Sequence, residues 1–229
     1  MSSARAWPER SRGSRRRIRT DTNRTRGRQP STDETAGVPG RSGAVATVQN
    51  VSDSSVILRT LVLGGARSGK SGYAEQLASD AGRPVRYLAT SVPDPADTDF
   101  AERIAVHRAR RPADWTVVES ADPATVLADA APVTLIDDIG TWLTARIDAR
   151  DAWELPRGTV APELDALVRA VADYRERLII VSPEVGMGVI PSHRSGRLFR
   201  DEIGGLNQQL ARVCDEVFLV VAGIPMHVK

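Results

Sequence analysis

The sequence predicts an α/β fold with a mainly parallel central sheet flanked by helices. Six short apolar runs are continuous rather than alternating, which is typical of strands buried on both faces. Most of these runs are separated by stretches with helical spacing, as in parallel α/β folds. A glycine-rich turn also joins the first run to a helix that begins at Ser71. The runs are residues 56–63, 85–90, 116–119, 133–137, 178–182 and 216–222.

Helices are expected in four of the intervening stretches. A helix over 71–81 is followed by Gly82 as a C-terminal cap, and one over 100–111 is stopped by Pro112. A third, over 162–177, starts with a proline in its first turn. In the fourth, apolar residues recur at spacings of four and three and form one helical face: Phe199, Ile203, Leu206, Leu210 and Val213.

Charge divides the 229-residue chain into two parts. Residues 1–50 hold 11 arginines against 4 acidic residues, a net charge of +7, whereas the remainder has 20 basic and 25 acidic residues, a net of −5. Residues 1–52 have almost no large apolar side chains after Trp7, so we predict a disordered basic tail ahead of one domain over 53–229. The tail is either an electrostatic arm for nucleic acid or a partner, or a dispensable extension, including a start codon assigned too far upstream. Because the body is acidic, no nucleic-acid partner is expected.

The composition also bears on the compartment. Cys214 is the single cysteine, which excludes an intramolecular disulfide and a cysteine-rich metal site and suits a reducing compartment. No run approaches the roughly 18 apolar residues of a membrane span, and the N-terminus lacks the apolar segment of a secretory signal. We therefore expect a cytoplasmic protein without a membrane span.

The strongest motif is Gly64-Gly65-Ala66-Arg67-Ser68-Gly69-Lys70-Ser71, which fits the phosphate-binding pattern G-x-x-x-x-G-K-[ST]. It follows a predicted strand and opens a predicted helix, as a P-loop must. Its glycines let successive backbone N–H groups point at phosphate oxygens, and the helix N-terminus adds a favourable dipole. Lys70 supplies a charge for the β- and γ-phosphates, and Ser71 is placed to ligate Mg²⁺.

A P-loop needs an acidic partner for its metal on a neighbouring strand. Asp137 closes the apolar run at 133–137, at the carboxyl edge where ligands bind in open α/β sheets. Asp138 could share or replace that role. An ordinary polar strand end is the alternative interpretation.

His107 differs from the other two histidines because it lies among arginines. On a helix, Phe100, Ile104, His107 and Arg111 share one face. The arginines would suit a triphosphate and would disfavour imidazolium, leaving a nucleophilic nitrogen. From the spacing alone, a core histidine without a catalytic role is the favoured interpretation.

Several segments together resemble one family, the bifunctional adenosylcobinamide kinase/adenosylcobinamide-phosphate guanylyltransferases. The resemblance runs from about Leu58 to Lys229 and is most specific in the His-Arg…Arg-Pro and Glu-Val-Gly-Met-Gly segments. It is carried by residues 64–71, Tyr87-Leu88-Ala89-Thr90, Arg103-Ile104, His107-Arg108, Arg111-Pro112, Trp115, residues 184–191, Phe199-Arg200-Asp201 and Leu206-Asn207-Gln208.

The resemblance implies a RecA-like P-loop NTPase fold, a homotrimer and two reactions. A nucleoside triphosphate, ATP or GTP, would phosphorylate adenosylcobinamide, a corrinoid. GTP would then guanylylate a histidine, and that GMP would pass to adenosylcobinamide phosphate to give adenosylcobinamide-GDP, a step of cobalamin biosynthesis. A covalent intermediate of this kind splits one transfer into two.

The resemblance also assigns residues. His107 would carry GMP, Lys70 would act with it in catalysis, and Mg²⁺ would lie at Ser71 and Asp137. The remaining guanine-nucleotide contacts would fall on the loop Gly64, Gly65, Ala66, Arg67, Ser68, Gly69, Lys70 and Ser71, on Ala89, Thr90 and Ser91, on Arg108, Ala109, Arg110 and Arg111, and on Glu119 and Asp137.

The chain departs from the family pattern at three places. Pro183 replaces a usual Asn, Asp138-Ile139-Gly140-Thr141-Trp142 replaces a Cys-Leu-Thr-Leu-Trp type sequence, and Ser192-His193-Arg194-Ser195-Gly196 replaces Glu-Asn-Ala-Leu-Ala. The first and third flank a segment just beyond a strand end, where a substrate could sit. Two other functions stay open: a P-loop kinase for another small alcohol or nucleotide, with a structural His107, and a non-catalytic binding module that uses the basic tail.

Overall fold

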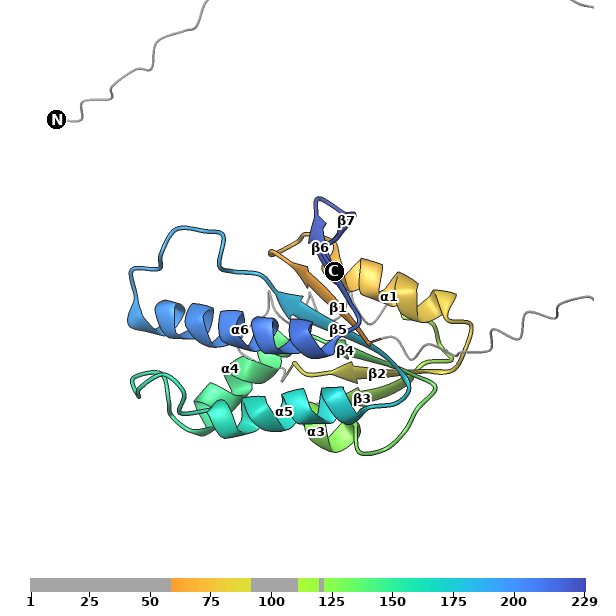
Figure 1. The fold of residues 1–229 in the computed structure, drawn as a ribbon, viewed down its shortest axis with the longest axis horizontal. Coiled ribbons are helices and arrows are strands. Elements are labelled where there is room, and N and C mark those ends of the chain that lie inside the picture. Colours follow the sequence, from red (N-terminus) through yellow and green to blue (C-terminus); the bar gives the residue numbers. More distant parts are fainter. Residues whose placement is uncertain (1–58, 92–110, 120–121) are drawn as a thin grey trace, which may run out of the picture. The chain divides into compact units, whose positions relative to one another are not determined.

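The computed structural model describes residues 59–91, 111–119 and 122–229. Its centre is a seven-stranded sheet in the order β3-β2-β4-β5-β1-β6-β7 (Figure 1). All neighbouring strands run parallel except β6 and β7, which form an antiparallel pair. The strands are β1 (Arg59–Gly64), β2 (Val85–Ala89), β3 (Thr116–Glu119), β4 (Val133–Asp137), β5 (Arg177–Pro183), β6 (Glu216–Val221) and β7 (Ile224–His227).

Helices cover both faces of the sheet, as Figure 1 shows, with α1 on one side and α4, α5 and α6 on the other. The core is accordingly split into two clusters, one beneath α1 and one beneath the remaining helices. Successive residues of one strand enter different clusters: Leu61 packs in the second and Val62 in the first. This explains the continuous apolar runs, because a strand covered on both faces needs apolar side chains at odd and even positions. The helices are α1 (Lys70–Asp80), α3 (Pro123–Val126), α4 (Ile139–Ala149), α5 (Ala161–Asp173) and α6 (Arg194–Val213).

The predicted α/β class with a mainly parallel sheet flanked by helices is confirmed. The predicted strands over 116–119 and 133–137 have the observed bounds, and Gly82 follows α1 with a left-handed φ of 60°. The predicted apolar face of α6 faces the core, where Ile203, Leu206 and Leu210 are fully buried. The predicted tail and most of the predicted helix over 100–111 lie outside the described residues.

Two predictions about the sheet and its helices are wrong. The helix predicted to reach Arg177 ends at Asp173, because Tyr174 turns into an extended conformation and its hydroxyl lies 2.9 Å from the Thr134 hydroxyl oxygen. Arg177 instead begins β5. The strand β3 is an edge strand among the described residues, and 42% of the Val117 side chain is exposed, so this run is not buried on both faces.

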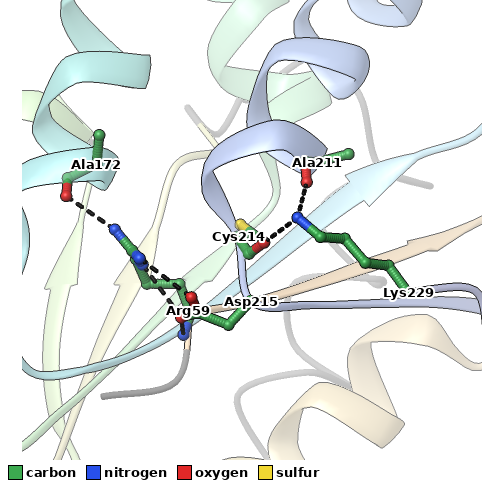
Figure 2. Close-up of polar contacts among 6 residues, drawn as sticks. All are labelled: Arg59, Ala172, Ala211, Cys214, Asp215 and Lys229. Atoms are coloured by element: carbon green, nitrogen blue, oxygen red, sulfur yellow. Dashed lines mark hydrogen bonds and ion pairs between the residues drawn. The ribbon is translucent and has the colours of Figure 1, made fainter. Parts of the chain in front are cut away.

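A cluster of polar contacts closes the amino edge of the sheet (Figure 2). The Arg59 guanidinium donates to both carboxylate oxygens of Asp215, at 3.2 and 3.1 Å, and to the Ala172 carbonyl at 2.8 Å. The hydrogen bonds from Arg59 lower the pKa of Asp215, and the bond to Asp215 raises the pKa of Arg59. This pair joins the start of β1 to the segment between α6 and β6.

The same edge holds the end of α6. Lys229 Nζ donates to the carbonyls of Ala211 and Cys214, at 2.9 and 2.7 Å, where the last turn of the helix leaves carbonyls without helical partners (Figure 2). Burial raises the pKa of the Cys214 thiol to about 12, so this cysteine stays protonated and unreactive at neutral pH.

Candidate active site

The predicted phosphate loop joins β1 to α1 at the carboxyl edge of the sheet. Its conformation depends on glycine at two positions. A Cβ on Gly64 would lie 2.4 Å from Ser68 Oγ and 2.8 Å from the Val220 carbonyl oxygen, and Gly69 has a φ of 94°. Arg67 also adopts a left-handed φ, of 55°. This conformation wraps the backbone tightly around the Ser68 side chain, as a phosphate loop requires.

Two hydrogen bonds from other segments hold this loop. The Glu184 N–H donates to the Gly64 carbonyl at 3.0 Å, and the Gly223 N–H donates to the Ser68 carbonyl at 2.7 Å. The first bond comes from the residue after β5 and the second from the turn between β6 and β7. The loop is therefore fixed by both strands that pair with β1, before any ligand binds.

The proposed metal ligands lie side by side. Ser71 Oγ, in the first turn of α1, donates to Asp137 Oδ1 at the end of β4 at 3.1 Å, although β5 separates β4 from β1, the strand that leads into the loop. The other carboxylate oxygen, Asp137 Oδ2, accepts a 2.6 Å hydrogen bond from the Tyr87 hydroxyl. A hydroxyl and a carboxylate beside a phosphate loop are the hard oxygen ligands that Mg²⁺ takes in such sites, together with phosphate and water. The donor set thus fits Mg²⁺.

Tyr87 is buried, with 1% of its side chain exposed. Burial, followed by the charge of Asp137 and the hydrogen bond to it, raises the pKa of the tyrosine hydroxyl above its ordinary value. The hydroxyl therefore keeps its proton and acts as a permanent donor to the carboxylate. This fixes the orientation of Asp137 towards the phosphate loop.

Asp138 caps a helix, which differs from the metal-binding role considered for it. It is the N-cap of α4, where its Oδ1 accepts from the Thr141 N–H at 2.9 Å. This satisfies one of the free N–H groups at the start of the helix. Asp137 is consequently the carboxylate that faces the loop.

The strand register gathers other predicted nucleotide contacts at this edge. Ala89 pairs with Asp137 on one side and with Glu119 on the other. Thr90 follows, buried, and its hydroxyl donates to the Asp138 carbonyl at 2.5 Å. Ser91 comes next along the chain and is half-buried.

Arg111 brings the end of the arginine-rich segment to the same edge. Its guanidinium carbon lies 3.8 Å from the centroid of the Tyr87 ring, in a cation–π contact, and the ring of Trp115 also packs on Tyr87, with 6.0 Å between the two ring centroids. Arg111 is therefore one side chain away from Asp137. The other predicted residues of this segment, His107, Arg108, Ala109 and Arg110, lie outside the described residues.

A cavity of about 360 Å³ opens beside the phosphate loop. Besides the loop, its walls come from the segment after β5 and from the end of β6. It is lined by Gly65, Ala66, Arg67, Ser68, Glu184, Met187, Leu219, Val220, Val221 and Ala222.

Sequence reasoning gave no role to Tyr87 or Glu184, although both stand in the segments that carry the resemblance. The signal for Tyr87 was a hydroxyl-bearing side chain in a mainly apolar strand, two residues before its end. For Glu184, the sequence alone could not show that its backbone N–H bonds to the loop. Together, the loop, the Ser71–Asp137 pair and the parallel sheet define a P-loop nucleotide-binding protein.

The sequence relatives narrow this class. Residues 60–228 match the family described as cobinamide kinase / cobinamide phosphate guanyltransferase. The chain is 41% identical over 176 residues to the bifunctional adenosylcobalamin biosynthesis protein CobP of Pseudomonas aeruginosa, covering 75% of this chain and 98% of the relative. It is 39% identical over 181 residues to the corresponding protein CobU of Salmonella typhimurium, covering 74% and 98%. The chain therefore belongs to this family of kinases and nucleotidyltransferases.

Matches among solved structures include a type III secretion system ATPase, at a TM-score of 0.45 and 10% identity, with 74% of this chain and 56% of that chain covered. Another is the RadB recombinase, at a TM-score of 0.41 and 16% identity, with 71% and 73% covered. No helix in the described ranges is long and apolar enough to cross a membrane.

Proposed function

We propose that this protein phosphorylates adenosylcobinamide and then transfers GMP from GTP, through a guanylylated His107, to adenosylcobinamide phosphate. One observation carries the proposal beyond family membership. The phosphate loop, the Ser71–Asp137 pair and Arg111 converge on one edge of the sheet, so a triphosphate bound there would lie near Arg111, which follows His107 by four residues in the sequence.

The kinase step forms one P–O bond, breaks another and releases the proton of the attacking hydroxyl to water. The aminopropanol hydroxyl of adenosylcobinamide attacks the γ-phosphorus of ATP or GTP, and the bond to the β-phosphate oxygen breaks, releasing the nucleoside diphosphate. Lys70 and the loop N–H groups balance the charge that develops on the phosphoryl oxygens. Ser71 and Asp137 would hold Mg²⁺, which neutralises phosphate charge when it is bound.

The guanylyl transfer uses the α-phosphate instead. A neutral imidazole nitrogen of His107 attacks the α-phosphorus of GTP, and pyrophosphate leaves as a P–N bond forms. A phosphate oxygen of adenosylcobinamide phosphate then attacks the same phosphorus, breaking the P–N bond and giving adenosylcobinamide-GDP. Arginines 108–111 beside His107 would favour its neutral form and bind the leaving pyrophosphate.

Intact-mass measurement tests the covalent step. Incubation with GTP and Mg²⁺ is expected to add the mass of one GMP to the wild type and to His227→Ala, a control for losing a histidine from exposed strand β7. The His107→Ala variant is expected to gain no mass. A folded, GTP-binding wild type without an adduct would leave a P-loop kinase with a structural His107.

A parallel assay tests the substrate. Adenosylcobinamide is expected to be phosphorylated in the presence of ATP or GTP, whereas turnover with a different small alcohol and none with adenosylcobinamide would support the alternative kinase. The homotrimer and the cytoplasmic location stay predictions of the resemblance, which size measurement in solution and cell fractionation would check.

A further inference from the structure

The second cavity of the described structure lies between α4 and the start of α6, outside the phosphate loop. Its volume is about 560 Å³, within the range of small-molecule sites. Its lining combines two aromatic rings with small or hydroxyl-bearing residues: Thr144, Trp153, Ser195, Gly196 and Phe199. The two proposed reaction steps assign no role to the residues of this cavity.

The aromatic walls are fixed before any ligand arrives. The Trp153 indole N–H donates to Asp148 Oδ1 at 2.6 Å, and both Trp153 and Phe199 pack against the main core cluster. Because the rings of Trp153 and Phe199 are already held in place, a ligand that packs on them does not have to immobilise them. This lowers the entropy cost of binding.

The wall that carries Trp153 is also fastened to α6. Arg194 donates to the Leu155 carbonyl at 2.8 Å, and the Gly158 N–H donates to Glu202 Oε1 at 2.7 Å. Arg157 and Asp201 add an ion pair between the same two segments. Hydrogen bonds and an ion pair therefore hold the walls of this cavity in place.

A short segment connects this cavity to the phosphate loop. Arg200, the neighbour of Phe199, donates to the carbonyls of Gly186 and Gly188, the latter at 3.1 Å. Between those glycines, Met187 lines the cavity beside the phosphate loop. Phe199 of one cavity and Met187 of the other are therefore linked through Arg200 and residues 186–188.

We infer that the Trp153–Phe199 cavity binds an edge of the corrin macrocycle of the substrate; this rests on the proposed function. A corrinoid ring presents methyl groups and carbon framework, which suit the aromatic walls, and amide arms, which suit a hydroxyl. The Ser195 hydroxyl makes no hydrogen bond to another described residue and can serve such an amide. The aminopropanol arm then extends past Met187 towards the phosphate loop.

Corrinoid binding tests this inference directly. Wild-type full-length protein, Trp153→Ala, Trp153→Phe, Ser195→Leu and the control Ile224→Ala, an exposed residue on β7, are titrated with adenosylcobinamide in a calorimeter. We expect the dissociation constant to rise at least about tenfold in Trp153→Ala and Ser195→Leu, to change little in Trp153→Phe, and to stay unchanged in Ile224→Ala. GTP affinity and the GMP adduct are expected to stay at wild-type levels in all of them.

The two proposals fail in different ways. Unchanged corrinoid affinity in both Trp153→Ala and Ser195→Leu, with the GMP adduct intact, overturns the cavity assignment and leaves the proposed function standing. A wild type that neither binds adenosylcobinamide nor gains GMP overturns both. If Trp153→Ala does not fold, Ser195→Leu decides, because it fills the cavity without removing a packed ring.

Discussion

The two edges of the sheet use polar groups in opposite ways. At the amino edge, the polar groups of Arg59, Asp215 and Lys229 find partners within the protein, and the contacts join strand starts to helix ends (Figure 2). At the carboxyl edge, Ser71 and Tyr87 converge on one carboxylate, that of Asp137. The backbone around them adopts left-handed conformations that are costly for a residue such as Arg67.

The groups that stabilise the fold and the groups that face the candidate active site therefore lie at opposite edges of the sheet. Ion pairs at the amino edge link elements that are far apart in sequence, so their loss should lower the free energy of unfolding. Groups at the carboxyl edge are held ready for a ligand, so their loss should reduce activity with little effect on stability. Substitutions at each edge, measured for both activity and the free energy of unfolding, test this division of roles.

The largest effect is expected for Lys70→Ala at the carboxyl edge. Removing the cation that we propose to face the β- and γ-phosphates should slow phosphorylation and adduct formation by about a hundred- to a thousandfold. The free energy of unfolding should change by no more than about 0.5 kcal/mol, as for substitutions away from packed features. Single-turnover kinetics and urea unfolding check the two parts; a large loss of stability would contradict the separation of roles.

A smaller effect is expected for Tyr87→Phe, which removes the hydroxyl that holds Asp137 Oδ2. Outer contacts of metal ligands commonly change metal affinity by about 10- to 100-fold. The Mg²⁺ concentration for half-maximal adduct formation should rise by about tenfold, while the Arg111 and Trp115 contacts to the ring persist. Tyr73→Phe on α1, whose ring packs on Phe218, is the matched control and should keep the wild-type Mg²⁺ dependence.

A third prediction concerns two departures from the family pattern that meet in space. A Cβ on Gly140 would lie 2.6 Å from Pro183 Cγ, so Gly140→Ala should destabilise the protein by about 1–2 kcal/mol, despite alanine's higher helix propensity. Pro183→Ala removes the ring and should restore most of that loss in the double variant. A coupling free energy near zero in urea unfolding of the four proteins would show that the two sites are independent.

The smallest effect is expected at the amino edge, for Asp215→Asn. Because about a third of the Asp215 side chain is exposed, losing its ion pair with Arg59 should lower the free energy of unfolding by only about 1 kcal/mol at neutral pH. The folded pKa of Asp215 lies below the ordinary 3.8, so the stabilisation is present above that value and is lost as the pH falls through the lowered folded pKa. Unfolding curves from pH 7 down to about pH 2 should show a difference between wild type and variant that is steady above the ordinary pKa of 3.8 and shrinks below it. A difference that stays constant over the whole range would exclude the ionised pair as its cause.

Local patterns predicted much of the fold. The apolar runs located six strands, and in central strands such as β1 and β5 burial on both faces explains the continuous signal. The glycine pattern at 64–71 located the phosphate loop. The edge strand β7 and the short helix α3 were missed, since neither has a strong period of its own. The helix α4 was missed because its first residues were considered only as a departure from a family pattern, although Asp138 and Thr141 form a cap.

The site was predicted less completely than the fold. Asp137 could be chosen from its place at a strand end, but choosing it over Asp138 needed the observed cap of α4. The role of Tyr87 depends on strand register, which brings β2 and β4 together across 50 residues of sequence. Long-range pairing of this kind leaves no trace in local residue patterns.

The most direct test of a guanylylated histidine on the reaction path is a chase of the labelled protein. Wild type is incubated with α-phosphate-labelled GTP and Mg²⁺, freed of nucleotide, and mixed with adenosylcobinamide phosphate. The account predicts that the label leaves the protein and appears in adenosylcobinamide-GDP at least as fast as steady-state turnover, and that His107→Ala carries no label. Label that stays on the protein while product continues to form from GTP would contradict a guanylylated histidine on the reaction path.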